Sequence, residues 1–166
     1  MIKNFILILL LLFATYSITA QEVEKPTENK GFVFSPGIIL QSNMFVEANL
    51  LYGNVVNVPG KIPIMYYSGF RIGIESNLST DHYTFAPKIG YEYTPELLSF
   101  RLSAVNYFQD AKSEFRILPE IGLSLFTLIN LNYGYGISFN DQNLHNVGKH
   151  RISMTINLNK TLNRAW

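Results

Sequence analysis

Hydrophobic and polar residues alternate with a period of two along most of the chain, from Gly31 almost to the C-terminus. The alternating segments are rich in Val, Ile, Phe, Tyr and Thr, and clusters of Asn, Gly, Pro and Asp separate them, which is typical of β-strands and their turns. Each segment contains nine to thirteen residues. The pattern predicts eight strands: Gly31–Gln41, Met44–Tyr52, Ile64–Glu75, His82–Tyr93, Leu97–Phe108, Glu114–Leu125, Thr127–Phe139 and Lys149–Asn159.

The two faces of each predicted strand differ sharply in chemistry. In the sixth strand, for example, Phe115 and Ile121 lie on one face, and Arg116 and Glu120 lie on the other. Eight such strands predict an all-β fold, an eight-stranded antiparallel up-and-down β-barrel with one apolar and one polar face. Every charged residue within the strands falls on the polar face; these residues are Glu47, Arg71, Glu75, Lys88, Glu92, Arg101, Glu114, Arg116, Glu120, Lys149 and Arg151.

Alternation alone does not say which face points inward. A soluble lipocalin-like barrel has its apolar face inside, whereas an outer-membrane barrel turns that face towards lipid. The strand lengths match the ~9–11 residues that a tilted strand needs to cross a bilayer. Aromatic residues gather near the strand ends, as in interfacial girdles, and only 15% of all residues are charged, against about a quarter in a soluble domain. These features favour a transmembrane barrel.

The N-terminal segment has the pattern of a secretory signal peptide, with Lys3, an apolar run and a boundary of small residues at Ala20. The apolar run is too short for a transmembrane helix. We therefore divide the chain into a signal peptide (1–20), a polar leader (21–30), the barrel (31–159) and a C-terminal tail (160–166). Cleavage after Ala20 removes one of thirteen basic residues and leaves twelve against twelve acidic ones, so no nucleic-acid partner is expected.

The signal peptide, the eight alternating strands and the aromatic C-terminal residue resemble the small OmpA/OmpX-type outer-membrane barrels over essentially the whole mature chain. The resemblance implies the outer membrane of a Gram-negative cell, with membrane lipids and the barrel assembly machinery as partners; we expect a monomer. In that family a terminal aromatic helps the machinery to recognise the last strand, and Trp166 is the corresponding residue. Lys160 and Arg164, on the same face, depart from the apolar series expected before it.

The charges on the polar face are expected to form a buried ion-pair network, because an eight-stranded barrel encloses little more than its own side chains and an unpaired buried charge is costly. Arg71 or Lys88 is expected to meet Glu92, Glu75 or Glu47 across the interior. The predicted network consists of Glu47, Arg71, Glu75, Lys88, Glu92, Arg101, Arg116, Glu120 and Arg151.

Candidates for chemistry are few. The chain has no cysteine, phosphate-binding loop, zinc-ligand spacing or nucleophile elbow, and no cofactor is expected. His82 and Thr84 imitate the His-x-Ser pair of lipid A deacylase barrels, but on the predicted lumen face. His145 and His150 flank the last loop without acidic or thiolate partners, which is a weak pattern for a metal site.

Two features fit a closed barrel poorly. Pro36, Pro87 and Pro119 lie inside predicted strands, where a residue without an N–H interrupts pairing, and we expect β-bulges there. The connection 53–63 is long for a periplasmic turn, whereas the long loop 140–148 falls at the extracellular end as expected.

Four functions remain open. We favour a non-enzymatic outer-membrane barrel with a structural or surface-interaction role and a filled lumen. A lipid-modifying barrel enzyme would change the mass of lipid A, and a narrow channel would conduct in a planar bilayer. A secreted lipocalin-like binder would fractionate without detergent.

Overall fold

The computed structural model describes residues 27–58, 64–78 and 82–159. The predicted signal peptide, the first part of the predicted leader, and the C-terminal tail with Trp166 lie outside the described residues. Among those described, no helix is long and apolar enough to cross a membrane.

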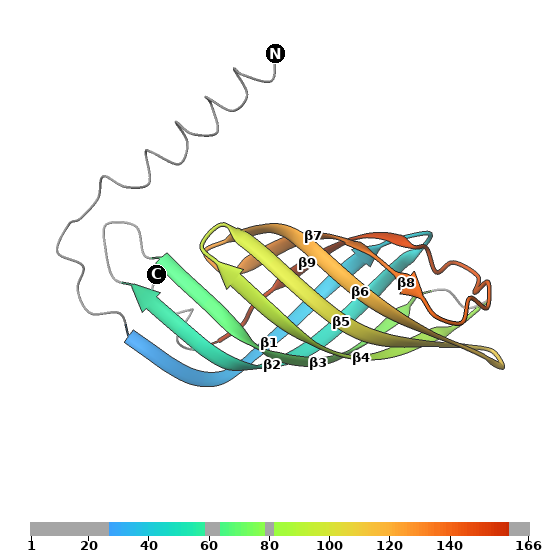
Figure 1. Ribbon diagram of the computed structural model, residues 1–166, viewed down its shortest axis with the longest axis horizontal. Helices are drawn as coiled ribbons and strands as arrows, with labels where there is room; N and C mark the ends of the chain where they lie inside the picture. The colour runs from blue at the N-terminus through green and yellow to red at the C-terminus, as the bar shows by residue number, and fades with distance from the viewer. Residues whose placement is uncertain (1–26, 59–63, 79–81, 160–166) are drawn as a thin grey trace, which may run out of the picture.

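The described residues form an antiparallel β-sheet closed into a barrel (Figure 1). Consecutive strands pair from β1 to β7, β7 also pairs with β9, and pairing of β1 with β9 closes the barrel. β7 and β8 both pair with β6 and are separated only by Gly136, so together they make one barrel strand. The predicted eight-stranded, antiparallel, up-and-down barrel is thus confirmed. The strands are β1 (Thr27–Leu40), β2 (Met44–Val58), β3 (Ile64–Asn77), β4 (Thr84–Pro95), β5 (Leu98–Gln109), β6 (Lys112–Leu125), β7 (Ile129–Tyr135), β8 (Ile137–Ser138) and β9 (His150–Ile156).

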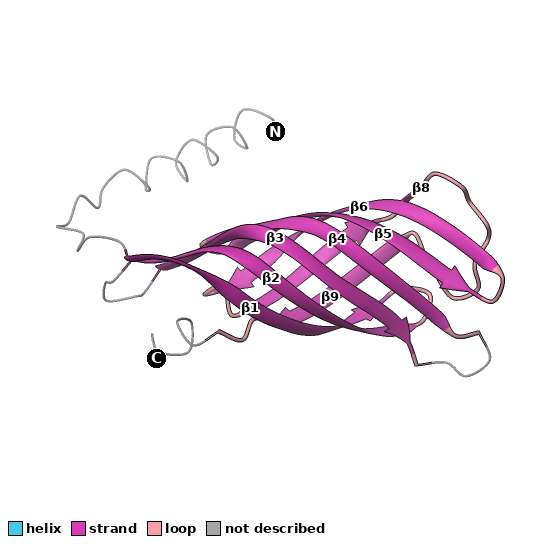
Figure 2. Ribbon diagram, turned by 90° about the horizontal axis from the view of Figure 1, so that it is seen from below, coloured by secondary structure: helices cyan, strands magenta, loops and turns pink. Residues whose placement is uncertain are grey.

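The strands are staggered around the barrel. A path that starts at Lys30 and follows paired residues through all the strands returns to β1 at Leu40, ten residues further along. Such a stagger requires the strands to tilt steeply against the barrel axis, typically by about 35–45°. Figure 2 shows this tilt. Each strand therefore crosses the wall obliquely, and residues far apart in sequence reach the same level of the interior.

Several strand ends differ from the prediction. β1 begins at Thr27, because Thr27–Lys30, assigned to the leader, pair with 54–57 of β2. β2 in turn continues to Val58, so the long connection predicted at 53–63 shortens to 59–63. The last strand ends at Ile156, although Leu158 still exchanges two backbone hydrogen bonds with Phe34.

The expectation of β-bulges at the three prolines is wrong. A bulge adds a residue to one strand and shifts the register, but the register is the same on both sides of Pro36, Pro87 and Pro119. Instead, at each proline the pairing with one of the two neighbouring strands is interrupted, and it resumes beyond the proline in the same register. The wall of the barrel therefore tolerates three missing donors without a change in strand pairing.

The apolar face of the sheet points outward and the polar face points inward. Phe70 and Ile121 are 67% and 55% exposed, whereas Glu75 and Glu92 are fully buried. The same alternation runs along every long strand. The orientation that the sequence left open is therefore that of a barrel with a polar interior.

Candidate functional site

Among the described residues, ten charged side chains lie buried in the lumen, five acidic and five basic. They comprise all nine residues of the predicted network and Glu114. Each of the ten has at least one oppositely charged partner within 4 Å among the described residues, so the interior is close to electroneutral. Balanced, paired charges are the condition under which ionic groups can be buried without a large loss of stability.

Glu75 on β3 is the best-satisfied carboxylate of the network. Arg151 on β9 donates to both of its oxygens, over 2.9 and 3.0 Å. Lys88 donates to Oε1 over 2.8 Å, and the Tyr107 hydroxyl donates to Oε2 over 3.2 Å. Side chains from three other strands thus contact this one carboxylate of β3, and the bidentate pair with Arg151 fixes its orientation.

A second group of charges continues from Lys88 along the lumen. Lys88 also contacts Glu47, whose carboxylate lies 3.6 Å from Arg71. Glu92 accepts from Arg71 over 3.2 Å, and its Oε2 lies 3.0 Å from Nε of Arg101. The expected contacts of Arg71 and Lys88 with the three glutamates are therefore present, as four separate ion pairs.

A third group of charges extends from the network towards the end of the barrel where β1 ends and β9 begins. Glu120 lies 3.5 Å from Nε of Arg151 and accepts from the Ser153 hydroxyl over 3.2 Å. Nearer that end, Glu114 accepts from Nε of Arg116 over 2.6 Å. The guanidinium of Arg116 lies 5.2 Å from the ring centre of Tyr107, which contacts Glu75 and Arg151. The ten charges thus extend over much of the lumen.

Glycines on the lumen face make room for these long side chains. A Cβ added at Gly134 would lie 2.7 Å from Cγ of Glu120 and 3.1 Å from Cγ of Arg151. One added at Gly37 would lie 2.5 Å from the Met154 carbonyl and 3.0 Å from a carboxylate oxygen of Glu47. Larger residues there would displace the ion pairs.

Apolar side chains fill the lumen on both sides of the charges. Towards the end where β1 begins and β9 ends, one buried cluster consists of Val33, Leu51, Val55 and Tyr67. At the opposite end, which we call the mouth, a second cluster contains two residues of the last loop. The mouth cluster consists of Ile39, Phe45, Ala86, Val105, Tyr107, Leu118, Leu144 and Val147.

The loop 139–149, which we call the lid, folds over the mouth and inserts Leu144 and Val147 into the mouth cluster. The side-chain amide of Gln109 exchanges two hydrogen bonds of 2.7 Å with the backbone of His145. Arg116 donates to the carbonyls of Gly148 and Val147 over 2.7 and 3.3 Å. The lid is therefore held by apolar insertion and by buried polar side chains of the barrel wall.

The histidines lie at the mouth, and His82 and Thr84, which imitate a His-x-Ser pair in the sequence, contact different partners. The hydroxyl of Thr84 is buried and contacts Gln109, Asn77 and the backbone carbonyl of His82. The ring of His82 instead lies 3.3 Å from Asp110 and stacks on His145, with centroids 4.5 Å apart.

Two other residues, at the junction of the lid and β9, lie outside the lumen. Lys149, expected on the lumen face, is exposed, and its ammonium lies 3.1 Å from Asp141. The hydrogen bond from Lys149 lowers the pKa of Asp141. His150 is exposed on the outer surface, with Nδ1 2.6 Å from the Tyr133 hydroxyl. The described residues include no group of three or more His, Cys, Asp or Glu side chains suited to a metal ion.

Sequence reasoning missed the polar residues that hold the lid. Gln109 follows the predicted strand that ends at Phe108, and Leu144 and Val147 lie in a loop without periodicity. Glu114 was placed on the polar face but not among the network residues, and its Oε2 accepts the Gln142 N–H of the lid over 3.0 Å. A signal for the lid was the pair of apolar residues inside an otherwise polar loop.

Comparison with known proteins finds no match among protein-family models, curated proteins or solved structures. Function is therefore inferred from the geometry of the chain itself. Its main features are the outward apolar face, the paired charges of the lumen and the lid over the mouth.

Proposed function

We propose that the protein is an outer-membrane β-barrel that crosses the bilayer with its eight strands and has a non-enzymatic structural or surface-interaction role. The lid faces the cell exterior and the opposite end of the barrel faces the periplasm, since long loops of such barrels are extracellular. Membrane lipids surround the wall, and the barrel assembly machinery inserts the chain.

One observation carries this proposal: the outward face is apolar on every strand of the barrel. Phe32, Ile72, Leu123 and Met154 come from four different strands, and each is at least 41% exposed. Water-soluble proteins rarely expose an apolar area of this extent, whereas lipid requires it. The predicted signal peptide and the wall, whose backbone groups pair between strands, support the same environment.

The filled lumen favours a structural role over transport. The charges are paired with one another, and an apolar cluster lies on each side of them. An ion would have to displace the lid, break ion pairs and cross a second apolar layer, whereas a conducting pore offers a continuous polar path. A planar-bilayer recording is therefore expected to show no conductance.

Membrane fractionation tests the proposal. Expressed with its own N-terminal segment in a Gram-negative host, the protein is expected in the detergent-soluble outer-membrane fraction. An unboiled sample should run faster on a gel than a boiled one, because a closed barrel with paired backbone groups resists detergent. A boiled sample of the same preparation is the control, and recovery of folded protein in the soluble periplasm would refute the proposal.

A further inference from the structure

One edge of β1 extends beyond its described partner at the end of the barrel where β1 begins and β9 ends (Figure 1). β1 pairs with β2 over its whole length. Its pairing with β9 covers only 37–40, followed by an isolated bridge between Phe34 and Leu158. Residues 27–33 of β1 therefore pair with β2 on one side, and no described strand pairs with them on the other.

The backbone groups of this edge are oriented for a further strand. Phe34 exchanges two hydrogen bonds, over 3.1 and 2.7 Å, with the chain that follows β9, so its N–H and C=O point away from β2. Because these directions alternate along an antiparallel strand, the groups of Phe32, Lys30 and Glu28 also point away from β2. Among the described residues, only the Phe32 carbonyl has a partner there, the side-chain amide of Asn159 over 2.6 Å. The remaining groups form an open template for strand addition.

The C-terminal tail (160–166), which lies outside the described residues, follows directly from a residue at this edge. The bridge of Phe34 with Leu158 keeps the register of the β1–β9 ladder. Continued in that register, residue 160 falls opposite Phe32, and residue 166 falls opposite residue 26, directly before β1. The tail is therefore as long as the open edge.

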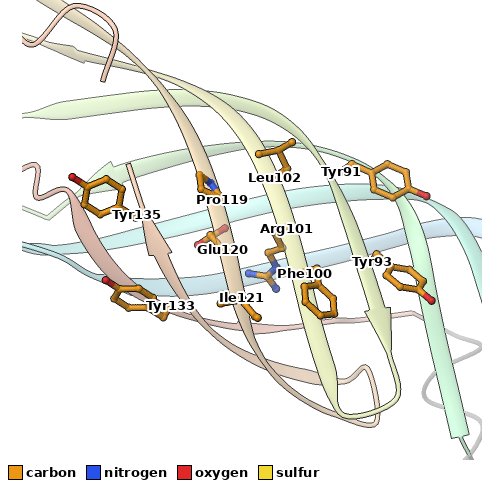
Figure 3. A pocket seen from close by; sticks show the side chains of 10 residues that line it. All are labelled: Tyr91, Tyr93, Phe100, Arg101, Leu102, Pro119, Glu120, Ile121, Tyr133 and Tyr135. Carbon is orange, nitrogen blue, oxygen red and sulfur yellow. The ribbon is translucent and has the colours of Figure 1, made fainter. Parts of the chain in front are cut away.

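The alternation of the tail sequence suits the same register. Alternate residues of a strand point to opposite faces, as Figure 3 shows for Arg101 inside the barrel, between the outward Phe100 and Leu102. Leu158 is exposed on the outer face, so a continued strand would carry Leu162 and Trp166 outward. The inner face would receive Thr161, Asn163 and Ala165, and small polar residues are common on that face elsewhere in the barrel.

Charge complementarity selects this register over its neighbours. Arg164 falls directly opposite Glu28, which is exposed, and opposite charges at facing positions stabilise strand pairing. A slip of one residue would turn Arg164 to the inner face and separate the two charges. The register also explains why Lys160 and Arg164 interrupt the apolar series before Trp166, because β1 carries Glu28 and Lys30 on its outer face at the same level.

We infer that residues 160–166 bind this edge as a continuation of the last barrel strand, hydrogen-bonded to Phe32, Lys30 and Glu28. The Phe32 carbonyl has two lone pairs, so the contact with Asn159 is compatible with this pairing. The occupant is the chain's own tail and not a second copy, because a segment tethered beside the edge has a far higher effective concentration than a free molecule. The inference goes beyond the proposed function and does not depend on membrane insertion.

An engineered disulfide tests this register, because the chain contains no cysteine of its own. Asn29→Cys combined with Asn163→Cys places two thiols at facing positions on one face, at a separation that a disulfide can bridge. Asn29→Cys combined with Leu162→Cys is the matched control, since the second thiol then points to the opposite face. After mild oxidation of the folded barrel in detergent, mass spectrometry of peptides should find the first pair linked within one chain, at a yield at least tenfold above the control.

Equal yields from the two cysteine pairs would overturn the inference, because a tail without a fixed register would link both. Disulfide-linked dimers would also overturn it, since a second copy would then occupy the edge. Circular dichroism of every variant restricts the comparison to folded protein.

Amide hydrogen exchange gives a second test without cysteines. Lys30 and Glu28 should exchange at least tenfold more slowly in the full chain than in a chain that ends at Asn159. Asn29, whose N–H faces β2, is the internal control and should exchange alike in both. Equal exchange at Lys30 in the two folded chains would contradict the inference, and if the shortened chain does not fold, the disulfide yields decide.

Discussion

Each lumen charge depends on a particular partner, and the Glu75–Arg151 pair is the clearest case because two hydrogen bonds join fully buried groups. Removal of one partner leaves the other charge buried, and such losses cost about 3–5 kcal/mol, whereas removal of both is often nearly neutral. Glu75→Gln and Arg151→Met should each lower the midpoint of unfolding in detergent, and the double variant should recover part of the loss, because Lys88 keeps Glu47 as a partner while Glu120 loses Arg151. Urea or thermal unfolding followed by circular dichroism measures this.

The exposed pair of Lys149 and Asp141 is the matched control, because water and salt screen it. Lys149→Gln should leave the unfolding midpoint unchanged. If Glu75→Gln had as little effect as Lys149→Gln, the lumen charges would not be a stabilising network.

Gly134 should be as important for the stability of the barrel as the charged side chains for which it leaves room. Gly134→Val would place side-chain atoms where Glu120 and Arg151 lie, since even a Cβ comes within 2.7 Å of Glu120. Overpacking of this kind costs about 1–3 kcal/mol. We expect a lower unfolding midpoint in detergent, whereas Gly31→Val, where a Cβ has its nearest neighbour at 3.9 Å, should be tolerated.

At the scale of strands and loops, the lid closes the mouth because Leu144 and Val147 insert into the mouth cluster. Leu144→Asp should release it, because an unpaired carboxylate in the mouth cluster is costly. Amide hydrogen exchange in the lid should become at least tenfold faster, while exchange in β2 and β3 stays unchanged. Asn143→Asp, an exposed change in the same loop, is the control. Unchanged exchange in the Leu144 variant would show that the apolar insertion does not hold the lid.

The strands also show where sequence reasoning succeeds and where it stops. Alternation assigned the faces of the strand residues correctly, because a residue's side of a strand depends on parity alone. Lys149 is the exception among the assigned charges, since it precedes β9 and is exposed. Contacts of Arg71 and Lys88 with nearby glutamates were within reach, since β2, β3 and β4 are neighbours. The pairing of Glu75 with Arg151 could not be predicted from the sequence, because it depends on the stagger of the closed barrel. Gly53 and Asn54 read as a turn, although β2 continues through them.

For the whole molecule, the free-energy cost of a charged residue on the outward apolar face should depend on the depth of that residue in the bilayer. Ile72 lies near the middle of β3 and is 54% exposed on the outer surface. An arginine facing the bilayer midplane costs about 2–4 kcal/mol, and one near the interface costs about 0–1 kcal/mol. Ile72→Arg should therefore strongly reduce folding into vesicles, and Ile72→Leu should not. Equal folding of the two variants would mean that this face does not meet lipid.

Quenching by brominated lipid tests the transmembrane orientation most directly. Trp166 is the single tryptophan of the chain, so Trp166→Phe provides a background without tryptophan fluorescence. Tryptophan is then introduced at Ile72 on the outer face or at Asn143 in the lid, and each protein is folded into vesicles with brominated acyl chains. We predict strong quenching for Ile72→Trp and little for Asn143→Trp. Absence of quenching at position 72 in a folded, vesicle-bound barrel would contradict a membrane-spanning wall.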